Sequence, residues 1–122
     1  MKLYLAGPMR GIPEFNFPAF HAGAKRLRSA GHIIFCAAER DIEKTGVDIS
    51  KGNAAGDNDL AEKQHGFNLR EALRDDLVFI CMEADGIALL PGWENSKGAV
   101  AERATAIALG LRVMTLEEAL DA

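Results

Sequence analysis

Short apolar runs alternate with longer stretches whose apolar residues recur at helical spacing. The runs predict strands at Leu3–Ala6, His32–Cys36, Gly86–Leu90 and Leu111–Met114. The stretches between them predict helices at Pro18–Ala30, from Asn68 to about Glu83, and at Lys97–Leu109. Thr115 and Glu118 form a capping box that predicts a short C-terminal helix. Strands that alternate with helices indicate an α/β domain whose parallel sheet is covered on both faces.

Residues 38–66 interrupt this alternation. They are polar and Gly-rich, without clear periodicity, and are expected to form a functional loop or a mobile lid. A short helical turn around Asp41 to Lys44 is the regular structure that we expect within them.

The composition is that of an ordinary globular protein, and 122 residues suit one domain over residues 1–122. A net charge of −4 gives no reason to expect a nucleic-acid polymer or a membrane as a partner. Cys36 and Cys81 lie in apolar runs and are interpreted as buried free thiols. No signal peptide or long apolar segment is present, so a cytoplasmic protein is expected. The histidines are scattered, and we expect no metal and no cofactor.

Two loops that follow strands have the composition of binding loops. The first comprises Gly7, Pro8, Met9, Arg10 and Gly11, where glycines let amides approach a ligand and the Arg adds a cation. In a sheet of order 2-1-3-4, this loop faces the one after the third strand, at the point where strand order reverses.

The second loop carries Trp93, Asn95, Ser96 and Gly98. Ser96 is placed to cap the next helix, whose N-terminus attracts phosphate or carboxylate. Trp93 is suited to stack on a base or to pack at a subunit contact. An alternative explains the two loops equally well. In it, both are tight turns that bind no phosphate, and Ser96 is only a helix cap.

Two carboxylates lie among small or apolar residues of their helices. Glu102 lies one to two turns inside an Ala-rich helix, and Asp76 falls in the row of Leu69, Leu73 and Ile80. A partly buried carboxylate that faces a pocket is a good nucleophile for the anomeric carbon of a sugar. The alternatives are surface ion pairs, of Glu102 with Arg103 or Lys97, and of the Asp with Arg70 or Arg74.

The segments from Leu5 to Phe20 and from Leu89 to Glu102 resemble a family of small phage and bacterial proteins, the domain-of-unknown-function 4406 group. This group looks like a branch of the nucleoside 2-deoxyribosyltransferase superfamily. The resemblance implies a three-layer flavodoxin-like (Rossmann-like) fold with a sheet of four to five strands in about the order 2-1-3-4. It also implies cleavage of the N-glycosidic bond of deoxynucleosides or their 5′-monophosphates.

The deoxynucleoside 5′-monophosphate N-hydrolases of that superfamily suggest roles for particular residues. Their pattern matches Tyr4 and Arg10 near the first strand, and Ser96 six residues before a catalytic Glu at Glu102. Their second catalytic carboxylate matches Asp76. This chain departs from the pattern at Arg103, where the enzymes often have Gly, and residues 38–66 have no counterpart.

The resulting expectation is an N-glycosidase that acts on (2′-deoxy)ribonucleoside 5′-monophosphates through Glu102 and releases the free base. The alternatives are a deoxyribosyltransferase that exchanges bases, and a nucleotide-binding module without catalysis. The expected partners are a small nucleotide or nucleoside and a second copy of the chain, in a homodimer or higher homo-oligomer.

Overall fold

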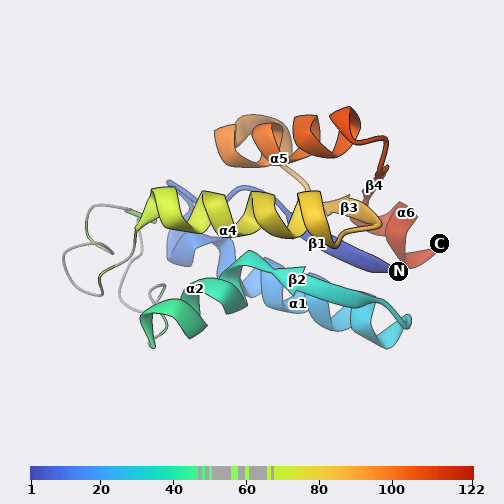
Figure 1. Cartoon of the computed structure of the whole chain (residues 1–122). Helices are drawn as coiled ribbons and strands as arrows, with labels where there is room; N and C mark the ends of the chain where they lie inside the picture. The colour runs from blue at the N-terminus through green and yellow to red at the C-terminus, as the bar shows by residue number, and fades with distance from the viewer. Residues whose placement is uncertain (47, 49, 51–55, 58–59, 61–65, 67) are drawn as a thin grey trace.

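The computed structural model describes residues 1–46, 48, 50, 56, 57, 60, 66 and 68–122 (Figure 1). The strands are β1 Lys2–Ala6, β2 Ile33–Cys36, β3 Gly86–Leu89 and β4 Arg112–Thr115. The α-helices are α1 Phe17–Ser29, α2 Ala37–Thr45, α4 Leu69–Met82, α5 Lys97–Ala108 and α6 Leu116–Leu120. Two 3₁₀ turns, η1 Pro13–Asn16 and η2 Trp93–Asn95, precede α1 and α5.

The strands form one parallel sheet in the order β2-β1-β3-β4. The predicted strand order is therefore confirmed, and the arrangement is consistent with a flavodoxin-like fold. Ala6 pairs with Leu89, and Leu5 pairs with Cys36. The loops after β1 and β3 and the start of α2 consequently leave the same edge of the sheet, on either side of the strand-order reversal.

Alternate residues of β1 point to opposite faces of the sheet and join different apolar clusters. Leu3 and Leu5 pack in a cluster with residues of α1 and α6, whereas Tyr4 and Ala6 pack with residues of α4 and α5. In Figure 1, α4 and α5 accordingly lie on one side of the sheet and α1 on the other. The three layers predicted from the alternation of strands and helices are present.

Side-chain caps fix the starts of three helices at the positions that the sequence predicts. Asn68 accepts a hydrogen bond from the amide of Glu71, and Ser96 accepts one from the amide of Ala99. Thr115 and Glu118 form the reciprocal capping box at α6. These caps set the register of α4 and α5, and therefore the faces that their carboxylates present.

The structure corrects the expectation of an irregular segment that begins at residue 38. Helix α2 starts directly after β2, and the predicted turn at Asp41 to Lys44 is part of it. Its buried residues are Ala37, Ala38 and Asp41, so its inner face is small and partly polar, and the helix as a whole is strongly polar. Most of the segment that was expected to form a lid lies outside the described part of the chain, namely residues 47, 49, 51–55, 58, 59, 61–65 and 67.

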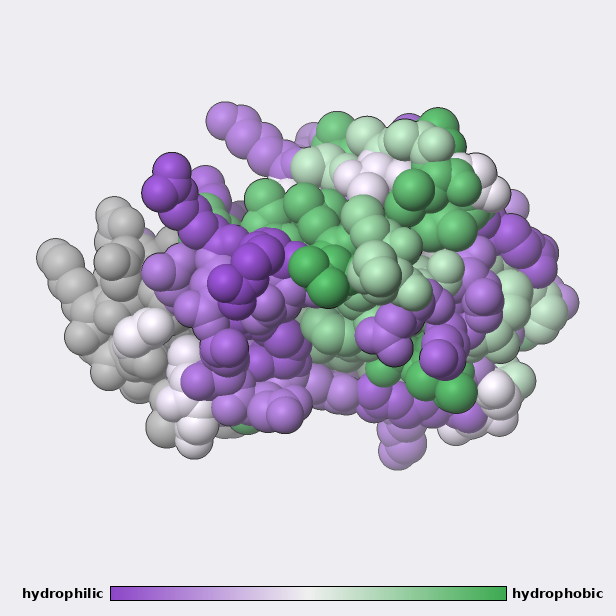
Figure 2. Space-filling model, viewed as in Figure 1, coloured by the Kyte–Doolittle hydropathy of each residue, from purple (hydrophilic) through white to green (hydrophobic). Residues whose placement is uncertain are grey.

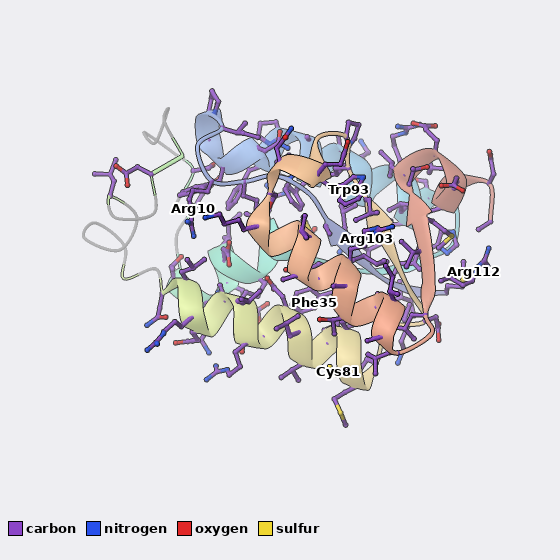
Figure 3. The ribbon with its side chains drawn as sticks, turned by 90° about the horizontal axis from the view of Figure 1, so that it is seen from above. Arg10, Phe35, Cys81, Trp93, Arg103 and Arg112 are labelled. Atoms are coloured by element: carbon purple, nitrogen blue, oxygen red, sulfur yellow. The ribbon has the colours of Figure 1, made fainter. Side chains whose placement is uncertain are left out.

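Two further expectations about burial are wrong. Cys36 is buried, but Cys81 lies on the solvent side of α4, where Figure 3 shows it pointing outward. Leu69, expected on the buried stripe of α4, is exposed, and the buried positions of that helix are Ala72, Asp76 and Ile80. The stripe is displaced because the first turn of α4 extends beyond the sheet edge.

A run of left-handed residues leads into α1. Glu14, Phe15 and Asn16 have φ values of 56°, 53° and 60°. Such conformations cost on the order of 1–3 kcal/mol each for residues other than glycine. The turn directs the Phe15 side chain into the first apolar cluster, where it is fully buried.

Within the described residues, no helix has the length and apolar character needed to cross a bilayer.

Candidate functional site

A cavity of about 410 Å³ opens at the carboxyl edge of the sheet, where strand order reverses. It is bounded by the loop after β1, the first turn of α5, and the facing sides of α2 and α4. Its lining includes most of the residues that the sequence predicts for the site, namely Tyr4, Gly7, Pro8, Met9, Arg10, Asp76, Asn95, Ser96, Gly98 and Glu102. Residues up to 98 positions apart in the chain are thus brought to one place, as the topology predicts.

Close packing holds the two strand-end loops against each other. A Cβ at Gly7 would lie 2.8 Å from Leu90 Cβ, so a larger residue there would force the loops apart. Gly92, with φ of 88°, approaches Pro8 on the other side of this contact. Gly7 is therefore required for packing between the loops, a role that differs from the amide contact to a ligand that we expected.

Glu102 is buried and held by Tyr4. The Tyr4 hydroxyl donates a hydrogen bond of 2.7 Å to Glu102 Oε2, and Glu102 is only 6% exposed. The alternative of a surface ion pair with Arg103 or Lys97 is wrong, since Glu102 faces inward. A hydroxyl donor favours the ionised carboxylate, whereas burial opposes it.

Asp76 faces the same interior from α4. It is 7% exposed, and its Oδ1 has no hydrogen-bond partner among the described residues. A buried polar atom without a partner costs about 1–3 kcal/mol, so a site that leaves one is suited to receive a ligand group. The aspartate of α4 that forms ion pairs with arginines is Asp75 instead of Asp76, and it contacts both Arg40 and Arg74.

The two facing carboxyls have raised pKa values. Burial raises the pKa of Asp76 to about 6, and hydrogen bonds from Tyr4 and Glu102 partly offset the effect. Burial also raises the pKa of Glu102, and the charge of Asp76 raises it further. Tyr4 stays protonated, since burial and the neighbouring Glu102 and Asp76 charges raise its pKa well above the usual value. The pair consequently retains a proton more readily than two exposed carboxyls would.

The end of the cavity nearest α5 is suited to an anion. Ser96, Lys97, Gly98 and Ala99 line it with the first turn of α5, whose free amides carry partial positive charge. Arg10 lies on the rim beside this helix end, as Figure 3 shows. The Ser96 hydroxyl accepts from the Ala99 amide, so it serves as the cap predicted for it.

Two of the predicted site residues do not line the cavity. The Gly11 amide donates a hydrogen bond of 3.0 Å to the Gly56 carbonyl, so this amide already has a partner within the chain.

Trp93 packs against the second apolar cluster, and the Arg103 guanidinium lies 4.9 Å from its ring centroid (Figure 3). In this position Trp93 links η2 to α5. Arg103, its contact on α5, directly follows Glu102, which faces inward.

Sequence reasoning missed Asp41, which lies on α2, lines the cavity and is 3% exposed. It also missed Phe15 and Phe20, which supply aromatic surface to the lining. The signal for Asp41 was weak, because α2 is a strongly polar helix and its Asp stands among other charged residues. Within the described ranges, no group of three or more His, Cys, Asp or Glu side chains is placed to hold a metal ion.

The raised carboxyl pKa values predict that stability falls as pH rises from about 4 to about 7. In the folded state the pKa values are about 6 for Asp76 and about 7 for Asp41, against 3.8 for an ordinary Asp, so the folded protein binds these protons more tightly. This stabilisation is present in full at pH values below the unfolded pKa and is lost as pH rises through the folded values. Ion-paired Glu39 and Asp75 have lowered pKa values and change stability only in more acidic solution.

Thermal unfolding at pH values across this window measures the effect. Asp76→Asn and Asp41→Asn should each flatten the dependence of Tm on pH, whereas Glu43→Gln, which removes an exposed carboxylate from α2, should leave it unchanged. Equal slopes in all of these proteins would mean that neither buried Asp retains its proton in the folded state.

Comparison with known proteins identifies a family. The model of a domain of unknown function, DUF4406, matches residues 1–115. Searches of curated proteins and of solved structures each gave no match. The matched range contains β1, the loop that follows it, α4, and the Ser96 to Glu102 segment, so all of the cavity belongs to the shared domain. The chain is therefore a member of the DUF4406 family.

Proposed function

We propose that this protein is an N-glycosidase that acts on (2′-deoxy)ribonucleoside 5′-monophosphates and releases the free base. The observation that carries the proposal is the buried Glu102, held by Tyr4 and facing Asp76, in a cavity whose other end is a helix N-terminus. Two carboxyls that face one sugar suit glycosidic cleavage, and the helix end suits the phosphate of the same ligand.

Glu102 is the nucleophile in this mechanism. Its hydrogen bond from Tyr4 uses Oε2, which leaves Oε1 to attack C1′ as the base departs. Burial and the charge of Asp76 raise the pKa of Glu102, and the reactive form is the one in which Glu102 is ionised. Positive charge that develops on the sugar ring stabilises that form. Water then resolves the glycosyl-enzyme ester.

Asp76 is assigned to the sugar or to proton transfer toward the base. Its unpartnered Oδ1 is available for a hydrogen bond to a substrate group. In its protonated form it donates to a sugar hydroxyl, and in its ionised form it accepts from one. Tyr4 positions Glu102 through the buried hydroxyl and lines the same cavity.

The phosphate is assigned to the first turn of α5 and to Arg10. The first turn of α5 lines this end of the cavity, and Arg10, which also lines it, would add a charge-assisted bond. Asn95 and Gly98 border the same end. Binding of the phosphate there would fix the sugar relative to Glu102, six residues further along the helix.

Incubation with the four common deoxynucleoside monophosphates, followed by chromatography for free base, tests the proposal. Wild-type protein should release base, and Glu102→Gln should lose turnover by several orders of magnitude while keeping its fold and its nucleotide binding, because an amide is a poor nucleophile. Glu94→Gln, which removes an exposed carboxylate just before α5, is the matched control and should remain active.

The outcomes separate the candidate functions. Base exchange in the presence of a second free base would indicate a transferase, and binding without turnover would indicate a nucleotide-binding module. Hydrolysis by Glu102→Gln at the wild-type rate would remove this residue from the mechanism.

Arg10→Ala should weaken binding of a monophosphate by about ten- to a hundredfold, since charge-assisted hydrogen bonds contribute roughly 1.5–3 kcal/mol. Binding of the matching nucleoside should change little. Calorimetry with both ligands measures the difference, and Arg112→Ala, on β4, controls for the loss of one positive charge. Equal losses for nucleotide and nucleoside would place the phosphate elsewhere.

A homodimer through α4 and α5 is part of the proposal. Val78 and Met82 on α4 and Val100 and Ile107 on α5 are exposed, and Figure 2 shows apolar surface gathered over these helices. Contiguous exposed apolar patches mark contact surfaces. Sedimentation equilibrium should show a dimer for wild type and for Ile33→Asp, an exposed apolar position on β2, and a monomer for Val78→Asp and Ile107→Asp. A monomeric wild type would exclude this interface.

A further inference from the structure

Asp41 is a buried carboxyl in the cavity that the proposed mechanism does not use. It lies on the inner face of α2, is 3% exposed, and lines the cavity together with Asp76 and Glu102. Carboxyls are rarely buried without a partner or a role. The cavity also contains Asp76 Oδ1, a second buried carboxyl oxygen, which has no hydrogen-bond partner among the described residues.

The surroundings of Asp41 fix one of its oxygens and leave the other available. Arg40 donates to Asp41 Oδ1 at 2.9 Å, and the guanidinium is itself held by Asp75 at 2.5 and 3.0 Å. Among the described residues, Asp41 Oδ2 makes no hydrogen bond. The charged groups around this carboxyl are Arg40 on its own helix, Asp75 and Asp76 on α4, and Glu102 on α5.

The electrostatic setting suits a group that gives up a proton near neutral pH. Burial and the charge of Asp76 raise the pKa of Asp41 to about 7, although the bond from Arg40 opposes the increase. A general acid works best when its pKa is close to the working pH. Arg40 would also stabilise the carboxylate that remains after the proton has left.

The order of the strands places Asp41 at one end of the cavity. Asp41 follows β2, Tyr4 is on the central strand β1, and Ser96 and Glu102 follow β3 on the other side. A nucleotide with its phosphate at the start of α5 and its sugar beside Glu102 therefore has its base directed toward α2. Phe15, Phe20 and Ala37 of the first cluster also line the cavity and give it apolar surface.

We propose that Asp41 is the general acid that protonates the leaving base, with α2 forming the base end of the cavity. This assignment rests on the proposed N-glycosidase function and gives Asp76 to the sugar alone. As Glu102 Oε1 forms a bond to C1′, the bond from C1′ to the base nitrogen breaks and its electron pair stays on the base. The proton of Asp41 moves from Oδ2 to a ring nitrogen of the base. Water then attacks C1′, the ester bond to Glu102 breaks, and the water proton returns to Asp41.

The assignment is tested by changing how much the leaving group needs a proton. The substrates are the four common deoxynucleoside monophosphates and the 4-nitrophenyl β-glycoside of 2-deoxyribose 5-phosphate, whose phenolate leaves without protonation. The proteins are wild type, Asp41→Asn, Asp41→Ala, Asp76→Asn, and Glu43→Gln, an exposed control on the same helix.

Asp41→Asn and Asp41→Ala should lower kcat on the deoxynucleotides by about a hundred- to ten-thousandfold, the usual contribution of a general acid. In the first turnover, both should release nitrophenolate from the nitrophenyl substrate within about threefold of the wild-type rate, since formation of the ester from this substrate needs no acid. In wild type, kcat on deoxynucleotides should fall above a pH of about 7, the pKa of Asp41, and this fall should be absent for the nitrophenyl substrate. Asp76→Asn should slow both substrates, and Glu43→Gln neither.

Other outcomes overturn the proposal in distinguishable ways. Equal losses on both substrates in the Asp41 variants would make the residue structural, and a selective loss in Asp76→Asn instead would move the acid to α4. If wild type cleaves the nitrophenyl substrate but no deoxynucleotide, the Asp41 assignment fails while a glycosidase with another leaving group remains. If wild type cleaves neither substrate, the proposed function fails and the assignment of Asp41 fails with it.

Discussion

The hydrogen bond from the Tyr4 hydroxyl to Glu102 Oε2 determines the character of this site. It joins the central strand of the sheet to the helix on the far side of the strand-order reversal, through a fully buried phenol. Without this donor, the Glu102 carboxylate would face an apolar interior, and its ionised form would be strongly disfavoured. Strand β1 thus contributes a side chain to the candidate site from within the core, where its position is fixed by pairing on both edges.

Much of the architecture follows from local sequence rules. Continuous apolar runs are typical of parallel strands covered on both faces, and capping residues such as Asn68 and Ser96 define where helices begin. Helix α2 is the exception, since Ala37, Ala38 and Asp41 form its buried side and include no large apolar side chain. Ion pairs and packing with α4 help to hold it in place, and contacts between distant segments cannot be inferred from the sequence of α2 alone.

Residues of the candidate site could be predicted from the sequence where the pattern of a single helix was enough to show their position. Asp76 was found from its position on the apolar row of α4, and Glu102 from its small-residue helix and its spacing from Ser96. Asp41 was not found, because its approach to the cavity depends on how α2 packs against α4. Likewise, the sequence of the first loop contains nothing to show that the Gly11 amide is used by Gly56.

The contact between Gly11 and Gly56 has a consequence for how the family can vary. A Cβ at Gly56 would lie 2.3 Å from the Ile12 carbonyl oxygen and 3.0 Å from the Gly11 nitrogen, and the residue already has φ of 61°. Any other residue there would displace the backbone next to Arg10. Substitutions at this distant glycine would therefore change the shape of the cavity without lining it, and relatives that differ at position 56 should carry a compensating change in the loop after β1.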